Sequence, residues 1–327
     1  MKLPRRRLLQ VAGAAVAASA LPRLASAFDY PVRPVRIVVG FPPGGVTDVG
    51  ARFLGEWLTG RLNQPFVIEN KPGASTQIAA EAVVHAPADG YTLLMASSTN
   101  AINVALYEKH NYDFIHDIAP VASVMHFPLV LVVHPSVPVE TVPELISYAK
   151  ANPGQMNLGS FGTGTGSHLA GELFKMMAGI AMVHVPYRGS APMLVDLLGG
   201  HVQAAFDNLP SSIEYIRTGK LRPLAVTTAK RLDALPDVPA LSETLPGYEA
   251  SSWIGVGAPA NTPTDIIGAL NTEINAALAD PQIGAKIANL SAVTLAGSPV
   301  DFGKLIAEDV AKWTKVIRAA DIKPEQS

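Results

Sequence analysis

The alternation of apolar runs with amphipathic helical patterns predicts an α/β protein. Val35 to Gly40 is an apolar run suited to a buried strand, and Ala51, Leu54 and Leu58 follow it at helical spacing. The same succession recurs along the chain, which favours parallel sheets covered by helices on both faces. With 327 residues, the chain is long enough to form two domains.

The first 27 residues are predicted to be an export signal that does not belong to the fold. Lys2 and Arg5-Arg6-Arg7 form a basic start, Leu8 to Leu21 is apolar, and Ala25-Ser26-Ala27 fits a cleavage site. The arginines also resemble a twin-arginine signal, and Sec export is the alternative. We therefore expect a periplasmic protein.

Charge and cysteine content restrict the classes of function. The first 27 residues hold five of the 25 basic residues and none of the 27 acidic ones, so the remainder carries a net charge of −7. A negative protein is a poor binder of nucleic acid or anionic membranes. There is no cysteine, which excludes disulfides, thiolate metal sites and a cysteine nucleophile. Any anion site must therefore be built from local donors.

Further elements follow in chain order. Ser190 is the expected N-cap of a helix from Ala191 to Leu198, and Thr262-Pro263 and Ser298-Pro299 read as helix starts with a capping residue before proline. The last helix is expected over about Pro299 to Ala319. The remaining strands are predicted at Phe66–Glu69, Tyr91–Met95, Val121–Met125, Leu129–Val133, Asn157–Ser160, Met182–Val185, Ala204–Phe206, Leu224–Thr227 and Ser252–Gly257.

Small, polar or glycine-rich loops follow several of these strands and open helices. In open α/β sheets, ligands lie beyond the carboxyl ends of the strands, where such loops meet. The loops therefore predict a binding cleft at this edge. They are Phe41–Asp48, Ala96–Asn100, Gly159–Ser167, Pro186–Ser190 and Asp207–Ser212.

The loop Gly159–Ser167 is the most distinctive of the set. Gly159, Gly162, Gly164 and Gly166 leave the backbone bare, and a helical pattern follows directly. Bare amide groups at a helix N-terminus can bind an anion. The alternative is a glycine-rich turn that caps the helix and binds nothing.

No reaction signature accompanies the cleft. Nucleophile-elbow, P-loop and zinc-protease motifs are missing, the dinucleotide glycine pattern is incomplete, and the histidines lack metal spacing. Asp48 and Asp207 read as an acid–base pair or as helix caps, and His168 and Tyr187 as ligand contacts or packing residues. We therefore predict binding without catalysis, cofactor or metal.

The chain resembles the extracytoplasmic solute receptors of the tripartite tricarboxylate transport family, the Bug-type receptors. The resemblance spans nearly all of the chain after the export signal. The segments that carry it are Tyr30–Arg36, Val38–Gly45, Asn70–Ala74, Asp89–Leu94, Gly159–Phe174, Val185–Pro192, Asp207–Pro210 and Gly219–Arg222.

The resemblance implies a type II periplasmic-binding-protein fold, a "Venus flytrap" of two doubly wound domains. We place domain 1 at residues 28–126 and 227–327 and domain 2 at residues 127–226. It further implies a small carboxylate solute, such as a di- or tricarboxylate, an acidic amino acid or an aromatic acid. A membrane permease with a large and a small subunit would receive it. The monomer is the default state.

In this family two loops hold a carboxylate from opposite sides, which points to Gly44 and Gly45 on one side and to residues 162–165 on the other. Ser75-Thr76-Gln77 and Arg188 depart from the usual family residues, so the far end of the solute is open. A receptor that feeds a signalling partner and an exported hydrolase are the alternatives. The full expected contact set is Phe41, Pro43, Gly44, Gly45, Thr47, Asp48, Ser97, Ser98, Asn100, Gly162, Thr163, Gly164, Thr165, Ser167, His168, Tyr187 and Asp207.

Overall fold

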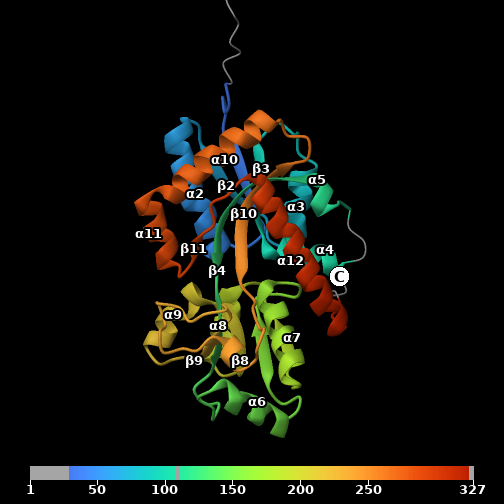
Figure 1. Ribbon diagram of the computed structural model, residues 1–327, viewed down its shortest axis with the longest axis vertical. Coiled ribbons are helices and arrows are strands. Elements are labelled where there is room, and N and C mark those ends of the chain that lie inside the picture. The colour runs from blue at the N-terminus through green and yellow to red at the C-terminus, as the bar shows by residue number, and fades with distance from the viewer. Residues whose placement is uncertain (1–28, 108–110, 324–327) are drawn as a thin grey trace, which may run out of the picture. The chain divides into compact units, whose positions relative to one another are not determined.

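The computed structural model describes residues 29–107 and 111–323. The predicted export signal at residues 1–27 lies outside this part of the chain. One compact unit spans Arg33–Ser327 and holds the described helices and strands. These form two sheets with helices packed against them, which confirms the α/β prediction (Figure 1).

The first sheet has six strands in the order β11-β4-β10-β3-β1-β2. Strand β1 pairs in parallel with β2 and β3, whereas β10 is antiparallel to both of its neighbours and β11 is antiparallel to β4. Its strands are β1 (Val35–Val39), β2 (Phe66–Asn70), β3 (Thr92–Ser97), β4 (Ile118–Phe127), β10 (Ser252–Pro259) and β11 (Val293–Thr294).

The second sheet has five strands in the order β7-β6-β8-β5-β9. Strand β6 is parallel to β7 and β8, and β5 is antiparallel to β8 and β9. Its strands are β5 (Leu129–Val133), β6 (Asn157–Ser160), β7 (Val183–Pro186), β8 (Ala204–Asn208) and β9 (Arg222–Val226).

Both sheets are mixed: the predicted parallel pairing is present in each sheet, but antiparallel pairs lie beside it. Parallel pairing needs a crossover connection that returns the chain to the same edge of the sheet. Strand β4 leads into β5 through Pro128 alone, so the chain passes from one sheet to the other without a crossover helix. The strand pattern in the sequence carries no information about this change of sheet.

Helices α2 to α5 and α10 to α12 accompany the six-stranded sheet, and α6 to α9 the five-stranded one. The helices are α2 (Val46–Leu62), α3 (Gln77–Val84), α4 (Ser98–Leu106), α5 (Phe114–Asp117), α6 (Val142–Ala151), α7 (Gly166–Ala178), α8 (Ser190–Leu198), α9 (Leu209–Arg217), α10 (Thr264–Ala279), α11 (Pro281–Asn289) and α12 (Pro299–Ala319). Short 3-10 turns lie at Ala74–Thr76 and Leu241–Glu243.

The predicted helix starts are confirmed in one case and wrong in two. Ser298 caps α12, and its side chain accepts a hydrogen bond from the Asp301 N–H. Thr262 does not cap α10, because its hydroxyl donates to the Pro259 carbonyl. Ser190 is the first residue of α8 and not its N-cap. Its hydroxyl is held elsewhere, by Asp207.

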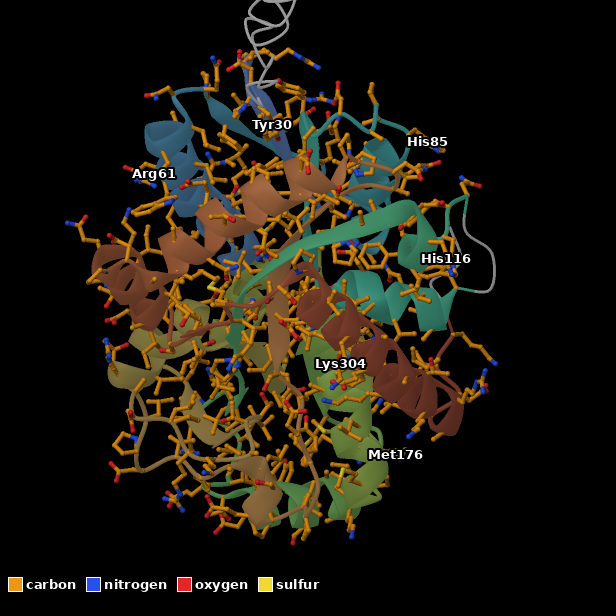
Figure 2. All side chains as sticks on the ribbon, turned by 45° about the horizontal axis from the view of Figure 1, so that its top comes forward. Tyr30, Arg61, His85, His116, Met176 and Lys304 are labelled. Carbon is orange, nitrogen blue, oxygen red and sulfur yellow. The ribbon has the colours of Figure 1, made fainter. Side chains whose placement is uncertain are left out.

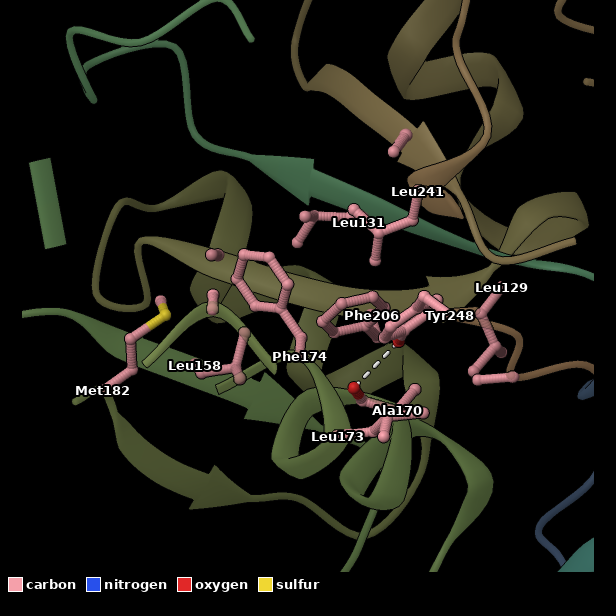
Figure 3. Close-up of a cluster of buried hydrophobic side chains, with 14 of the residues drawn as sticks. Leu129, Leu131, Leu158, Ala170, Leu173, Phe174, Met182, Phe206, Leu241 and Tyr248 are labelled. Atoms are coloured by element: carbon pink, nitrogen blue, oxygen red, sulfur yellow. Dashed lines mark hydrogen bonds between the residues drawn. The ribbon is translucent and has the colours of Figure 1, made fainter. Parts of the chain in front are cut away.

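The core of the five-stranded sheet reaches beyond that sheet's own strands (Figure 3). Phe174 of α7 and Phe206 of β8 pack edge to face, and the Tyr248 hydroxyl donates to the Ala170 carbonyl over 2.8 Å. Trp313 of α12 and Ile102 of α4 belong to the same buried cluster. Burial of such large side chains contributes about 2 kcal/mol each. Helices α4 and α12 therefore tie the two sheets together.

None of the helices in the described part of the chain combines the length and the apolar character that a membrane span requires.

Candidate functional site

A cavity of about 350 Å³ lies where the two sheets' helices face each other, and all five loops predicted from the sequence contribute to it. Each loop supplies an N-cap or first-turn residue of the helix that it opens. The lining residues are Phe41, Pro42, Pro43, Gly44, Gly45, Val46, Thr47, Ser97, Ser98, Thr99, Phe127, Phe161, Gly166, Arg188, Gly189, Ser190, Ala191, Pro192, Leu194, Asn208, Ser211 and Ser252.

The start of α2 brings bare backbone to the cavity. Gly45 is the N-cap, and Gly44 has φ +89°, a left-handed conformation that favours glycine. A Cβ atom at Gly44 would meet nothing within 4 Å. The backbone at this position is therefore open to a ligand.

Asp48 supports this loop and does not line the cavity. Its carboxylate accepts hydrogen bonds from the Gly44 N–H at 2.9 Å, from Arg52 at 2.9 Å and from Asn70 at 2.8 Å. Burial alone would raise the pKa of Asp48, but hydrogen bonds from Arg52, Gly44 and Asn70 outweigh it and hold the pKa below its ordinary value. Asp48 is thus an ionised brace for the glycine loop.

The start of α4 presents hydroxyl groups. Ser98 and Thr99 line the cavity, are almost fully buried, and make no side-chain hydrogen bond with another described residue. Asn100 instead turns back: its amide oxygen accepts from the Ser97 N–H at 2.9 Å, and its amide nitrogen donates to Thr76 at 3.0 Å. Asn100 fixes the turn, and its neighbours face the cavity.

The glycine-rich loop before α7 reaches the cavity only at its two ends, through Phe161 and Gly166. The stretch between them, Gly162 to Thr165, contacts the helices of the other sheet. The carbonyl of Thr163 accepts from Ser75, and a Cβ atom at Gly164 would lie 2.7 Å from Leu106. This stretch therefore forms a bridge between the two halves of the structure.

The side chains of Ser167 and His168, in the first turn of α7, both make hydrogen bonds to other parts of the chain. The Ser167 hydroxyl donates to the Phe206 carbonyl, and His168 Nδ1 accepts from the Gly164 N–H at 3.1 Å. The His168 ring stacks on His184 with centroids 3.8 Å apart. Burial lowers the pKa of His184 to about 3, and the neighbouring His168 and Lys175 act in the same direction. The hydrogen bond to Gly164 and the stacking on His184 of β7 therefore hold the glycine loop against the five-stranded sheet.

The starts of α8 and α9 are joined by Asp207, which is fully buried and does not line the cavity. It accepts from the hydroxyls of Ser190 at 2.6 Å and Ser212 at 2.7 Å. Burial raises the pKa of Asp207 to about 6, although both hydroxyls act against that rise. Tyr187 also turns away from the cavity, because its hydroxyl donates to Asp196 over 2.7 Å. Burial and that bond raise the pKa of Tyr187 to about 12.

Of the expected contact residues, Phe41, Pro43, Gly44, Gly45, Thr47, Ser97 and Ser98 line the cavity, whereas Asp48, Asn100, Gly162, Thr163, Gly164, Thr165, Ser167, His168, Tyr187 and Asp207 surround it. The lining residues outside the five predicted loops are Phe127, Ala191, Pro192, Leu194 and Ser252. Phe127 ends β4 and Ser252 begins β10, and that position at a strand end was the available signal for these two.

The cavity is nearly free of charged side chains. Arg188 is the one ionisable residue among those that line it, and it is exposed. Among the residues that the structure describes, no group of three His, Asp or Glu side chains could hold a metal ion. The exposed His85 and His116 lie on the surface, as Figure 2 shows. The cavity itself offers N–H groups, hydroxyls and apolar walls.

The sequence matches the family model described as tripartite tricarboxylate transporter family receptor over residues 51–322. Protein BugT of Bordetella pertussis is 38% identical over 320 residues, which are 97% of this chain and 98% of that one. This chain belongs to that receptor family.

Several similar proteins of solved structure share the fold. R. palustris Rpa4515 with adipate is 42% identical, with a TM-score of 0.87 over 90% of this chain and 100% of that one. MatC of Rhodopseudomonas palustris with bound malate is 31% identical, with a TM-score of 0.83 over 88% and 100%. The periplasmic binding protein BugD is 32% identical, with a TM-score of 0.84 over 90% and 100%. The predicted two-domain receptor fold is confirmed.

Proposed function

We propose that this chain is a periplasmic receptor that binds a small carboxylate in the cavity. The convergence of helix starts is the observation that supports this most. Helices α2, α4, α7, α8 and α9 each contribute an N-cap or first-turn residue to the same lining. The N-terminus of a helix carries unpaired N–H groups and about half a positive charge, so several of them together favour an anion.

The hydroxyl groups of the lining complete the donor set. Thr47, Ser98 and Ser252 line the cavity, are more than nine-tenths buried, and have no side-chain partner among the described residues. Neutral donors of this kind satisfy a carboxylate without burying a cation, which would cost several kcal/mol in desolvation. Such a site suits a receptor that must release its solute.

The structural relatives support the ligand class. Rpa4515 is described with adipate and MatC with malate, and both are small dicarboxylates. We infer that the solute here is also a small carboxylate, held between two lobes formed by residues 28–126 with 227–327 and by residues 127–226. The lobes deliver it to a membrane permease with a large and a small subunit.

The hydrolase alternative finds no support in the geometry. Asp48, Asp207 and His168 do not line the cavity, and each makes a bracing hydrogen bond described above. Binding without turnover is the function that the site favours.

A thermal-shift screen of mono-, di- and tricarboxylates, acidic amino acids and aromatic acids tests the proposal. A ligand at about 100 times its dissociation constant adds about 2.7 kcal/mol to the free energy of unfolding. The matched control is the uncharged diamide of each hit, which should leave the melting temperature unchanged. The proposal fails if no carboxylate shifts the melt at millimolar concentration. Turnover of a hit, followed by NMR, would instead favour the hydrolase.

A further inference from the structure

The turn Ala74–Thr76, between β2 and α3, has a backbone conformation that its residue types disfavour. The φ angle is +43° at Ala74, +48° at Ser75 and +73° at Thr76. This left-handed region is normally occupied by glycine, or by single asparagine and aspartate residues. Residues in such conformations persist only where the surrounding structure holds them, and they gather at ligand clamps and switch regions. The contacts that hold this turn therefore indicate its role.

Helix α4 holds the turn from one side. The Asn103 amide nitrogen donates to the Ser75 carbonyl, and the Asn100 amide nitrogen donates to the Thr76 hydroxyl over 3.0 Å. The Asn100 amide oxygen also accepts from the Ser97 N–H, which precedes the first residue of α4. The turn is thus fixed to the helix start that presents hydroxyl groups to the cavity.

The Ser75 hydroxyl joins the turn to the glycine-rich loop before α7, on the other half of the structure. It donates to the Thr163 carbonyl. Beside this bond, a Cβ atom at Gly164 would lie 3.9 Å from the Ser75 hydroxyl oxygen and 2.7 Å from Leu106 of α4. With φ +72° and so close a neighbour, this position suits glycine. The glycine-rich loop therefore packs against α4, and its two ends line the cavity.

We propose that Ser75 is a positioning residue for solute binding. Its hydroxyl fixes the start of α4 relative to the start of α7, so the donor groups on the two sides of the cavity are held at one separation. This inference rests on the proposed function, because it takes the solute to be a carboxylate bound at these helix starts. A site already held in its binding geometry avoids the entropy cost of ordering when the solute binds. Without the Ser75 bond, the two helix starts move relative to each other and part of the affinity is lost.

Two substitutions at this position separate the hydroxyl from the backbone conformation. Ser75→Ala removes the hydroxyl and keeps the disfavoured conformation, whereas Ser75→Gly removes both. Isothermal titration calorimetry with adipate, malate or another carboxylate that shifts the melt should show an affinity about 2- to 10-fold lower in both variants, as expected for one hydrogen bond. The melting temperature of the free protein should instead be higher for Ser75→Gly than for Ser75→Ala.

Ser147→Ala is the matched control. The Ser147 hydroxyl also donates to a backbone carbonyl, that of Pro143, but this bond lies within α6 and neither residue lines the cavity. Its loss should leave the affinity unchanged.

A distance measurement on the free protein tests the geometry without a solute. The chain has no cysteine, so His85→Cys after α3 and Met176→Cys in α7 provide two defined sites for spin labels. Both positions are exposed (Figure 2). Double electron–electron resonance should give a broader distance distribution when Ser75→Ala is added to this labelled pair, and an unchanged distribution when Ser147→Ala is added.

An unchanged affinity in a folded Ser75→Ala overturns the inference, as does an unchanged distance distribution. A lower melting temperature without either change would make Ser75 a structural residue only. If no carboxylate binds at all, the proposed function fails, and the distance distribution alone then decides whether Ser75 fixes the two helix starts.

Discussion

Replacing Asp48 by alanine tests whether this residue braces the glycine loop of the cavity. The side chain is 2% exposed and receives bonds from Gly44, Arg52 and Asn70. The Arg52 side chain is 51% exposed and can turn to water, so its bonds contribute little. The bonds from Gly44 and Asn70 to a buried carboxylate contribute about 1.5 kcal/mol each, so Asp48→Ala should lower the free energy of unfolding by about 3 kcal/mol.

Urea unfolding followed by tryptophan fluorescence measures this change, with Asp89→Ala as the control. Asp89 also pairs with an arginine, but both side chains are well exposed, so its loss should cost about 1 kcal/mol or less. Because the folded-state pKa of Asp48 is lowered, its contribution is present above pH 3.8 and is lost as the pH falls below that value. The difference between wild type and Asp48→Ala should therefore shrink in acid. A loss at pH 7 no larger than that of Asp89→Ala, with unchanged carboxylate affinity, would refute the role.

Three further predictions concern other buried groups. The folded-state pKa of His184 is lowered to about 3, so its contribution to stability is present above pH 6.5 and is lost as the pH falls toward 3. In urea titrations, the free energy of unfolding of the wild type should fall by about 1.4 kcal/mol per pH unit over this range, relative to that of His184→Leu. The pKa of Asp207 is raised to about 6, so the free energy of unfolding of the wild type, relative to that of Asp207→Asn, should fall by about 1.4 kcal/mol per unit as the pH rises from 3.8 to about 6. A difference between the two proteins that does not change with pH would contradict this. Gly255→Ala should destabilise by more than about 2 kcal/mol, because the Cβ atom would overlap the Phe302 ring, whereas Gly268→Ala in open space should stabilise by about 1 kcal/mol; equal melting temperatures would argue against this packing.

Local signals in the sequence predicted most elements and the edge at which the cavity lies. The capped start of α12 at Ser298 was predictable because the cap, the following proline and Asp301 are adjacent in sequence. The five loops were predictable because glycine, serine and asparagine between a strand and a helix signal a turn wherever they occur.

Contacts between distant segments could not be predicted in the same way. The orientation of the Gly162–Thr165 stretch depends on Ser75 and Leu106, which lie far away in the sequence. The sequence predicts Asp207 as a cleft residue, but two serines on separate helices, Ser190 and Ser212, hold its carboxylate in the structure. Ser252 lines the cavity only because β10 returns to the first sheet next to β3.

The most direct test of the central claim is a crystal structure with the tightest-binding carboxylate from the melt screen. We predict one carboxylate group within hydrogen-bond distance of the N–H groups that start α2 or α7 and of the hydroxyls of Ser98 or Ser252. A carboxylate paired only with exposed Arg188, or bound outside the cavity, would contradict the account.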